Sequence, residues 1–156
     1  MLRHRFHRQP NRLPTEVYRA PGRFFLTLCT EARATHFARE SIVRAVQEEL
    51  QVQATAHHVE IDAYCFMPDH LHLLVSSTEG ADVPSFVRLF KQRTAFWLRK
   101  RRAILLWQKG YYDHVLRHEE ESGAVAEYIL HNPVRAGLCE RWQDHPFSWS
   151  RWHDRE

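Results

Sequence analysis

Residues 64–75 of this chain read YCFMPDHLHLLV, and this stretch decides the fold. Apolar, strand-forming residues lie on both sides of Pro68-Asp69, a dipeptide that favours a tight turn. The pattern therefore predicts a β-hairpin. Because side chains alternate between the two faces of a strand, His70 and His72 should project together, while Leu71 points to the opposite face.

The segments outside this hairpin complete an order of β-α-β-β-α-β-α. Strands are expected over residues 23–30, 59–67, 70–76 and 111–117, and helices over residues 42–50, 84–102 and 119–132. Ser41 can cap the first helix, Pro84 can occupy the first turn of the second, and Pro133 should end the third. This order matches an α+β, ferredoxin-like (RRM-like) sandwich: an antiparallel sheet with helices on one face, plus a C-terminal helix that carries Tyr128.

Length and composition suit one domain. With 156 residues, 44% of them apolar and 26% charged, the chain can bury a core, and no apolar run approaches the roughly 18 residues of a membrane span. Residues 1–22 are basic, contain three prolines and show no periodicity, so we expect a basic N-terminal arm before a single domain over residues 23–156. The chain start lacks the apolar stretch of a secretory signal, and three cysteines without a CxxC pair suit the reducing cytoplasm.

Positive charge gathers in two blocks, although the net charge is only +3. Residues 1–23 hold six arginines against one acid, and residues 88–117 hold nine arginines and lysines against one acid. Such blocks suit a polyanionic partner, although a solvated surface would leave the same pattern. The candidates for contact with nucleic acid are Arg3, Arg5, Arg8, Arg12, Arg88, Lys91, Arg93, Arg99 and Arg117.

A candidate site combines the hairpin with the third expected helix. Two imidazoles on one strand face can hold a divalent cation, although they can also be ordinary strand histidines. Tyr128 and Asn132 are four residues apart and share one helix face, and an amide oxygen can bind a hard cation. A metal held by His70, His72 and Asn132 would lie close to the Tyr128 hydroxyl. The same residues also fit a core tyrosine and a helix stop, so both interpretations stay open on the pattern alone.

Two blocks of this sequence resemble the motifs of single-strand tyrosine transposases. Segment 64–75 resembles their histidine-hydrophobe-histidine (HUH) motif. The later run, with Trp107, YYDHVLR at residues 111–117 and EYILHNPVRAG at residues 127–137, resembles the REP-associated branch of that family. With PGRFF at residues 21–25 and PFSWS at residues 146–150, the resemblance covers most of the chain.

The resemblance implies a function and a role for each site residue. It implies a metal-dependent endonuclease and strand transferase that cuts and rejoins single-stranded DNA at palindromic repeat hairpins through a 5′-phosphotyrosine. Tyr128 would be the nucleophile, and His70, His72 and Asn132 would hold Mg²⁺ or Mn²⁺, with Asn132 in the place where insertion-sequence relatives carry glutamine. It favours a cytoplasmic, nucleoid-associated monomer over the dimers of those relatives.

Other interpretations remain open on the residues alone. The main alternative is a non-catalytic nucleic-acid-binding module on an RRM-like sheet, although no RNP-type aromatic pattern appears on the first or third expected strand. A metal-dependent hydrolase that activates water and a small structural metal protein are two more. Tyr111 and Tyr112 are rival nucleophiles because they lie close to Trp107, but neither has the one-turn relation to a ligand that Tyr128 has.

Overall fold

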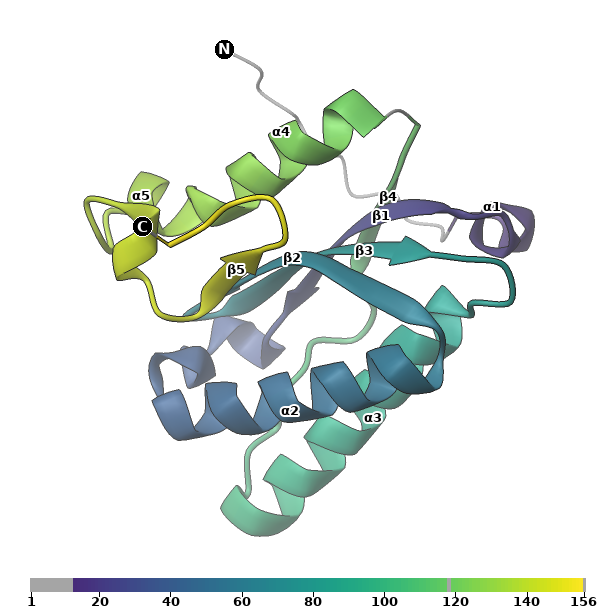
Figure 1. Cartoon of the computed structure of the whole chain (residues 1–156). Helices are drawn as coiled ribbons and strands as arrows, with labels where there is room; N and C mark the ends of the chain where they lie inside the picture. The colour runs from purple at the N-terminus through teal and green to yellow at the C-terminus, as the bar shows by residue number, and fades with distance from the viewer. Residues whose placement is uncertain (1–12, 118, 156) are drawn as a thin grey trace.

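A five-stranded antiparallel sheet runs through the centre of the molecule, in a computed structural model that describes residues 13–117 and 119–155 (Figure 1). The order across the sheet is β4 (Tyr112–Leu116), β1 (Gly22–Cys29), β3 (His70–Ser77), β2 (Val59–Met67) and β5 (Ser148–Ser150). All four pairings of these strands are antiparallel. The hairpin of β2 and β3 therefore lies inside the sheet, with β4 and β5 at the two edges.

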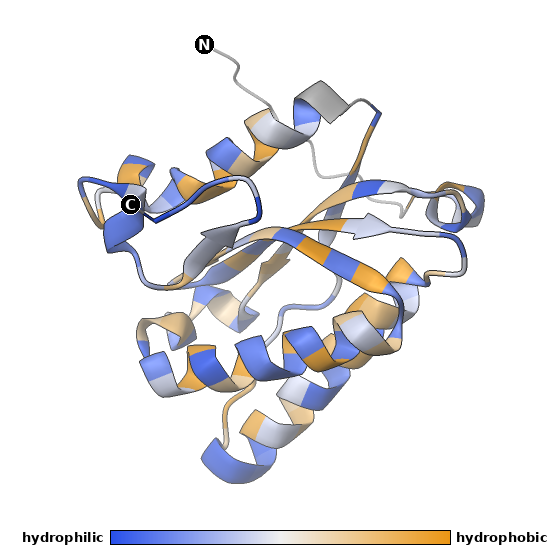
Figure 2. Cartoon of the chain, viewed as in Figure 1, coloured by the Kyte–Doolittle hydropathy of each residue, from blue (hydrophilic) through white to orange (hydrophobic). Residues whose placement is uncertain are grey.

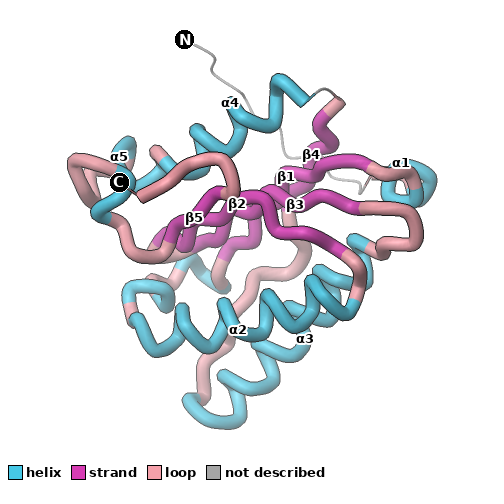
Figure 3. Tube along the Cα trace, viewed as in Figure 1, coloured by secondary structure: helices cyan, strands magenta, loops and turns pink. Residues whose placement is uncertain are grey.

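Helices cover both faces of this sheet. The two longest, α2 (Glu40–Ala56) and α3 (Val83–Arg102), pack on one face, while α4 (Glu119–Leu130) crosses the other (Figures 1 and 3). The remaining helices are short: α1 (Thr15–Arg19) and α5 (Asn132–Arg135), with 3₁₀ turns at Glu31–Arg33, His36–Ala38 and Trp142–Asp144. The α+β sandwich expected from the sequence is confirmed, and the C-terminal helix forms a third layer.

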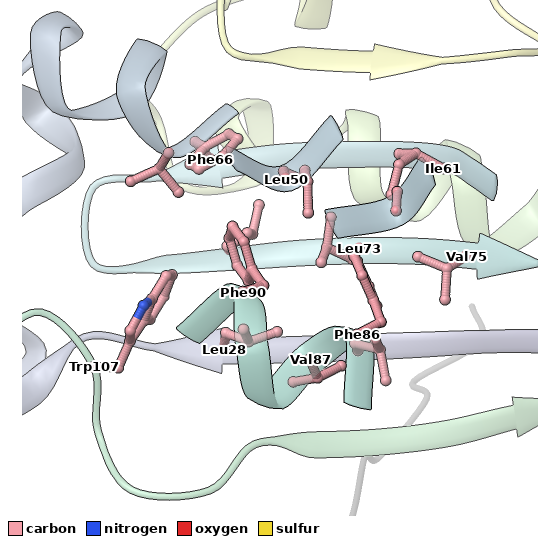
Figure 4. Packing of buried hydrophobic residues seen from close by; sticks show 14 of the residues in the cluster. Leu28, Leu50, Ile61, Phe66, Leu73, Val75, Phe86, Val87, Phe90 and Trp107 are labelled. Atoms are coloured by element: carbon pink, nitrogen blue, oxygen red, sulfur yellow. The ribbon is translucent and has the colours of Figure 1, made fainter. Parts of the chain in front are cut away.

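Each face of the sheet has its own apolar core. In the larger core, side chains of β1 and β3 such as Leu28 and Leu73 meet Leu50 of α2 and Phe90 of α3 (Figure 4). Along α2, apolar residues that face the core alternate with polar residues that face outward (Figure 2). The smaller core lies under α4, where the buried residues are Phe25, Ala63, Cys65, Met67, Leu74, Leu116, Val125, Ala126 and Ile129.

The predicted hairpin forms, and its two-residue turn is tied to the segment that follows β1. Pro68 and Asp69 connect β2 to β3, and their carbonyl oxygens accept hydrogen bonds of 3.0 Å from the backbone N–H groups of Phe37 and Thr30, respectively. These bonds fix the position of the turn, and with it the start of β3 at His70.

Some local predictions differ from the structure. Ser41 does not cap α2, because the helix already begins at Glu40 and Ser41 lies inside it. The residue at the N-cap is Arg39, whose side chain makes no capping hydrogen bond. The third expected helix ends two residues before Asn132, which instead begins α5, with Pro133 in the first turn where proline fits a helix. Strand β5 was not predicted.

The expected N-terminal arm is described only in part. Arg3, Arg5, Arg8 and Arg12 lie outside the described residues. Within the expected arm, α1 packs against the larger core through Tyr18, which is 5% exposed. None of the helices that the structure describes is both long and apolar enough to cross a membrane.

Candidate active site

The two histidines of the hairpin face α4, as the alternation along the strand predicts. The ring centroids of His70 and His72 lie 4.7 Å apart. Leu71, between them, is fully buried in the core on the opposite face of the sheet. The strand geometry therefore presents both imidazoles to one small region, at the end of β3 that adjoins the hairpin turn.

Each imidazole uses its Nδ1 atom for a contact within the protein. Nδ1 of His70 lies 2.7 Å from Oδ1 of Asp69, and Nδ1 of His72 lies 2.9 Å from Oγ1 of Thr27, its cross-strand partner on β1. A proton on each Nδ1 can be donated to these oxygens, which leaves the lone pair of each Nε2 for another partner. Histidines that bind metals commonly have their second nitrogen engaged in this way.

Burial keeps both imidazoles neutral. It lowers the pKa of His72 well below its ordinary value of 6.5, and it also lowers the pKa of His70, where Asp69 only partly offsets the effect. A neutral imidazole is the form that can bind a metal ion, because the bond to the metal needs the lone pair that a second proton would occupy.

Helix α4 and the start of α5 bring the other two candidate residues to this region. Nδ2 of Asn132 lies 3.3 Å from Nε2 of His70, and the ring of Tyr128 lies 6.3 Å from the ring of His72. Phe25 of β1 contacts the rings of both Tyr128 and His72. The structure therefore gathers His70, His72, Tyr128 and Asn132 from segments about 60 residues apart in the chain.

Arg135 is a residue of this region that the sequence did not single out. Its guanidinium lies 3.9 Å from the centroid of the Tyr128 ring, and its Nη2 atom donates a 2.6 Å hydrogen bond to the carbonyl oxygen of Tyr128. A cation over an aromatic ring is attracted by the electrons of that ring. The seven-residue spacing, two helical turns, was a signal that could have paired the two residues.

Asp69 is a second such residue, since the sequence indicated only a role in the turn. Its Oδ2 atom accepts a 2.9 Å hydrogen bond from Nε of Arg33, while Oδ1 contacts His70. Partial burial opposes the charge of this carboxylate, but the bonds from His70 and Arg33 outweigh it and hold the pKa of Asp69 below its ordinary value. Ala32 and Arg33 both have positive φ, at 52° and 54°, and this turn returns Arg33 toward Asp69.

The rival tyrosines are farther from the histidines. Tyr111 packs against the larger core, on the side of α2 and α3. Tyr112 of β4 pairs with Thr27 of β1, and Thr27 pairs with His72 of β3. Tyr112 therefore shares the sheet face of His72, but two strand spacings, roughly 10 Å, separate the two residues. Tyr128, in contrast, has a ring contact with His72.

The basic residues of α3 lie on the layer opposite α4. Arg88 and Arg99 are exposed, Arg93 pairs with Glu49 at 2.8 Å, and Lys91 donates to the carbonyl oxygens of residues 108 and 110. Arg117, exposed at the end of the edge strand β4, lies between the two layers. A nucleic acid that contacts both α3 and the histidine pair would therefore have to pass around the sheet.

Comparison with known proteins identifies the class. The family model described as "Transposase IS200 like" matches residues 23–132, which include β1, the histidine pair, Tyr128 and Asn132. The chain belongs to the IS200-like transposase family, whose members are enzymes that cut and rejoin DNA.

Individual relatives carry REP-associated names. A "Putative REP-associated tyrosine transposase" of Haemophilus influenzae is 25% identical over 81% of this chain and 78% of its own length. A "REP-associated tyrosine transposase" of Escherichia coli is 32% identical over 57% of this chain and 53% of its own length. A solved REP-associated tyrosine transposase bound to a REP hairpin has the same fold, with a TM-score of 0.76 and 22% identity over 90% of this chain and 81% of that one. The resemblance to REP-associated tyrosine transposases is confirmed.

Proposed function

We propose that this transposase cleaves and rejoins single-stranded DNA at palindromic repeat hairpins, with Tyr128 as nucleophile and a divalent metal ion at His70, His72 and Asn132. The observation that carries the proposal is the convergence of Tyr128 of α4 and Asn132 of α5 on the histidine pair. Asn132 contacts His70, and the Tyr128 ring contacts His72. This spatial relation is the one that metal-assisted attack by a tyrosine needs.

The donor set suits Mg²⁺ or Mn²⁺. Two neutral imidazoles offer Nε2 atoms, and a rotation of the Asn132 amide would present its oxygen where its nitrogen now lies, 3.3 Å from His70. Among the described side chains, no three or more His, Cys, Asp or Glu residues are arranged to hold a metal ion, so the amide and oxygens of the DNA would have to complete the shell. A mixed nitrogen and oxygen shell without cysteine favours Mn²⁺ or Mg²⁺ over zinc.

The reaction follows from these positions. A bound divalent ion supplies charge neutralisation to the phosphate oxygens. The Tyr128 phenol gives up its proton and its oxygen attacks phosphorus. A new bond joins this oxygen to the 5′-phosphate while the bond to the 3′-oxygen breaks, and the 3′-oxygen takes up one proton to become the 3′-hydroxyl. The phosphotyrosine diester retains the energy of the cleaved bond, so a 3′-hydroxyl of a second strand can reverse the step without ATP. Arg135, whose guanidinium lies over the Tyr128 ring, would help to hold that ring in place.

The proposed DNA partner rests on the neighbour and on charge. The solved neighbour is described as bound to a REP hairpin, and two relatives carry REP-associated names. Exposed cations at Arg88, Arg99 and Arg117 suit a phosphate backbone, whose contacts give affinity without sequence choice. We infer that a hairpin with single-stranded flanks is the substrate.

A pair of tyrosine variants tests the proposal. Wild-type protein, Tyr128→Phe and Tyr112→Phe are each incubated with a labelled single-stranded hairpin oligonucleotide in Mn²⁺ and separated on a denaturing gel. Tyr128→Phe should form neither a nick nor a covalent protein–DNA band, while Tyr112→Phe, which removes a hydroxyl from the same sheet face, should retain both. A nick without a covalent band in the wild type would instead indicate a hydrolase that uses water.

A further inference from the structure

A pocket of about 520 Å³ lies beside α3, outside the site described above. One wall is the first half of α3, and the other is the segment that leads from Trp107 to β4. Val87, Ala95 and Trp107 give the pocket apolar surface. Its volume falls in the range of small-molecule sites, which are concave and mostly apolar with a few polar groups.

Hydrogen bonds hold the walls of this pocket in place. Nζ of Lys91 donates to the carbonyl oxygens of Gln108 at 2.9 Å and of Gly110 at 2.5 Å, which fastens the second wall to α3. Nε1 of Trp107, a residue only 8% exposed, donates a 2.8 Å hydrogen bond to Oγ1 of Thr94 and so fixes the indole ring. The pocket is therefore a built feature of the fold.

The charge of the pocket is positive. Arg88, Lys91 and Lys109 line it, and its lining contains no aspartate or glutamate. Arg88 and Lys109 are exposed, and within the described residues neither forms an ion pair with an acidic side chain. In contrast, the larger groove between α2 and α3 is lined by Glu48 and Glu49. Of these two hollows, the one beside Trp107 is therefore the one that suits an anion.

The pocket lies close to the histidine pair. Cys29 of β1 pairs with His70, and its carbonyl oxygen accepts a 2.9 Å hydrogen bond from the backbone N–H of Gln108. Two strand spacings, roughly 10 Å, thus separate the backbone of Gln108 from that of His70. A flank of a few nucleotides that passes around the sheet would be long enough to join the histidine pair to this pocket.

We infer that this pocket receives one unpaired nucleotide of the single-stranded flank of the substrate, with the base against Trp107 and Ala95 and the phosphates at Arg88 and Lys109. This inference rests on the proposed function, since it assumes a single-stranded DNA substrate. A nucleotide combines an apolar, stackable base with an anion, which is the chemistry that the pocket lining offers. The pocket would hold the flank in register while Tyr128 acts on the phosphate.

Photochemical cross-linking locates the nucleotide. A series of hairpin oligonucleotides, each with 5-iododeoxyuridine at one position of a flank, is irradiated with the full chain and the cross-linked peptides are sequenced by mass spectrometry. Cross-links to Trp107 or Tyr111 should appear from one or two adjacent flank positions. If the covalent Tyr128 adduct forms but no flank position cross-links to residues 107–111, the pocket inference is wrong and the proposed function stands. Cross-links to residues 107–111 without a Tyr128 adduct would support the pocket and contradict the role of Tyr128 in the proposed function.

Charge and volume variants test the same pocket by affinity. Arg88→Gln with Lys109→Gln should lower the affinity for a flanked hairpin and reduce the salt slope by about 0.7 for each phosphate that the variant no longer neutralises. Arg19→Gln with Arg44→Gln, two exposed arginines that do not line the pocket, is the control with equal charge change.

A third variant, Ala95→Phe, fills the pocket while retaining its cations. It should weaken binding of the flanked hairpin about fivefold or more and leave the unflanked hairpin unchanged. Equal reductions in affinity for both hairpins, or a salt slope that the control pair changes as much as the Arg88 and Lys109 pair, would overturn the inference.

Discussion

Replacing Asp69 by asparagine should weaken metal binding without unfolding the protein. The carboxylate of Asp69 accepts from Nδ1 of His70 at 2.7 Å and from Nε of Arg33 at 2.9 Å, with one oxygen for each donor. Asparagine matches this shape but has one acceptor, so its NH₂ group must face a donor. Removing such a partner from a metal-binding histidine typically costs 10- to 100-fold in metal affinity or activity. That range corresponds to about 1.4–2.7 kcal/mol.

The assay is the rate of single-turnover cleavage of a hairpin oligonucleotide as a function of Mn²⁺ concentration. Asp69→Asn should raise the half-saturating Mn²⁺ concentration about 10- to 100-fold. Asp144→Asn is the matched control, because Asp144 also accepts from an arginine, Arg141, and within the described residues forms no hydrogen bond with either histidine. A folded Asp69→Asn protein whose half-saturating concentration equals that of the control would refute the proposed support of His70 by Asp69.

Three further predictions concern stability and metal removal. Asp82 caps α3 by accepting a 2.9 Å hydrogen bond from the Ser85 N–H, so Asp82→Ala should lower the free energy of unfolding by about 1 kcal/mol in urea denaturation. That hydrogen bond lowers the pKa of Asp82 below 3.8, so the destabilisation should be complete above pH 3.8 and shrink as the pH falls through the lower native value; a constant difference would count against it. Asp62 is fully buried and pairs with Arg23 and Arg151. Asp62→Ala removes this partner from both arginines and should lower the free energy of unfolding by about 3 kcal/mol in urea denaturation. A change near zero would show that the two ion pairs contribute little to stability. Chelation by EDTA should abolish adduct formation and added Mn²⁺ should restore it, with the melting temperature nearly unchanged because protein contacts already orient both imidazoles; a large fall in melting temperature would indicate a structural metal.

Local pattern predicted the main elements of the fold. The turn at Pro68-Asp69 and the alternation around it predicted the hairpin and the common face of His70 and His72, because both depend on residues adjacent in the chain. The spacing of Tyr128 and Asn132 likewise predicted that both would lie beside the histidines, although Asn132 begins α5 and is not part of the helix of Tyr128. Strand β5 was missed because three residues, Ser148–Ser150, are too few to show an alternating pattern, and because its pairing with β2 depends on the return of the distant tail.

The supporting contacts of the site could not be predicted, because they depend on register between distant segments. Thr27 supports His72 only because β1 pairs antiparallel with β3 in one register, and a slip of one residue would turn its side chain to the other face. Arg33 reaches Asp69 only because two consecutive residues adopt positive φ. The contact of Arg135 with Tyr128 is the exception, because their seven-residue spacing is visible in the sequence.

The position of a nucleotide adduct tests the central claim most directly. Wild-type protein is incubated with Mn²⁺ and a single-stranded repeat hairpin, digested with protease and nuclease, and analysed by tandem mass spectrometry. Attack by the helix-borne phenol beside the histidine pair predicts a nucleotide attached through a 5′-phosphate to Tyr128. An adduct on Tyr112 or on another side chain, formed in a reaction that cleaves the DNA, would contradict the account.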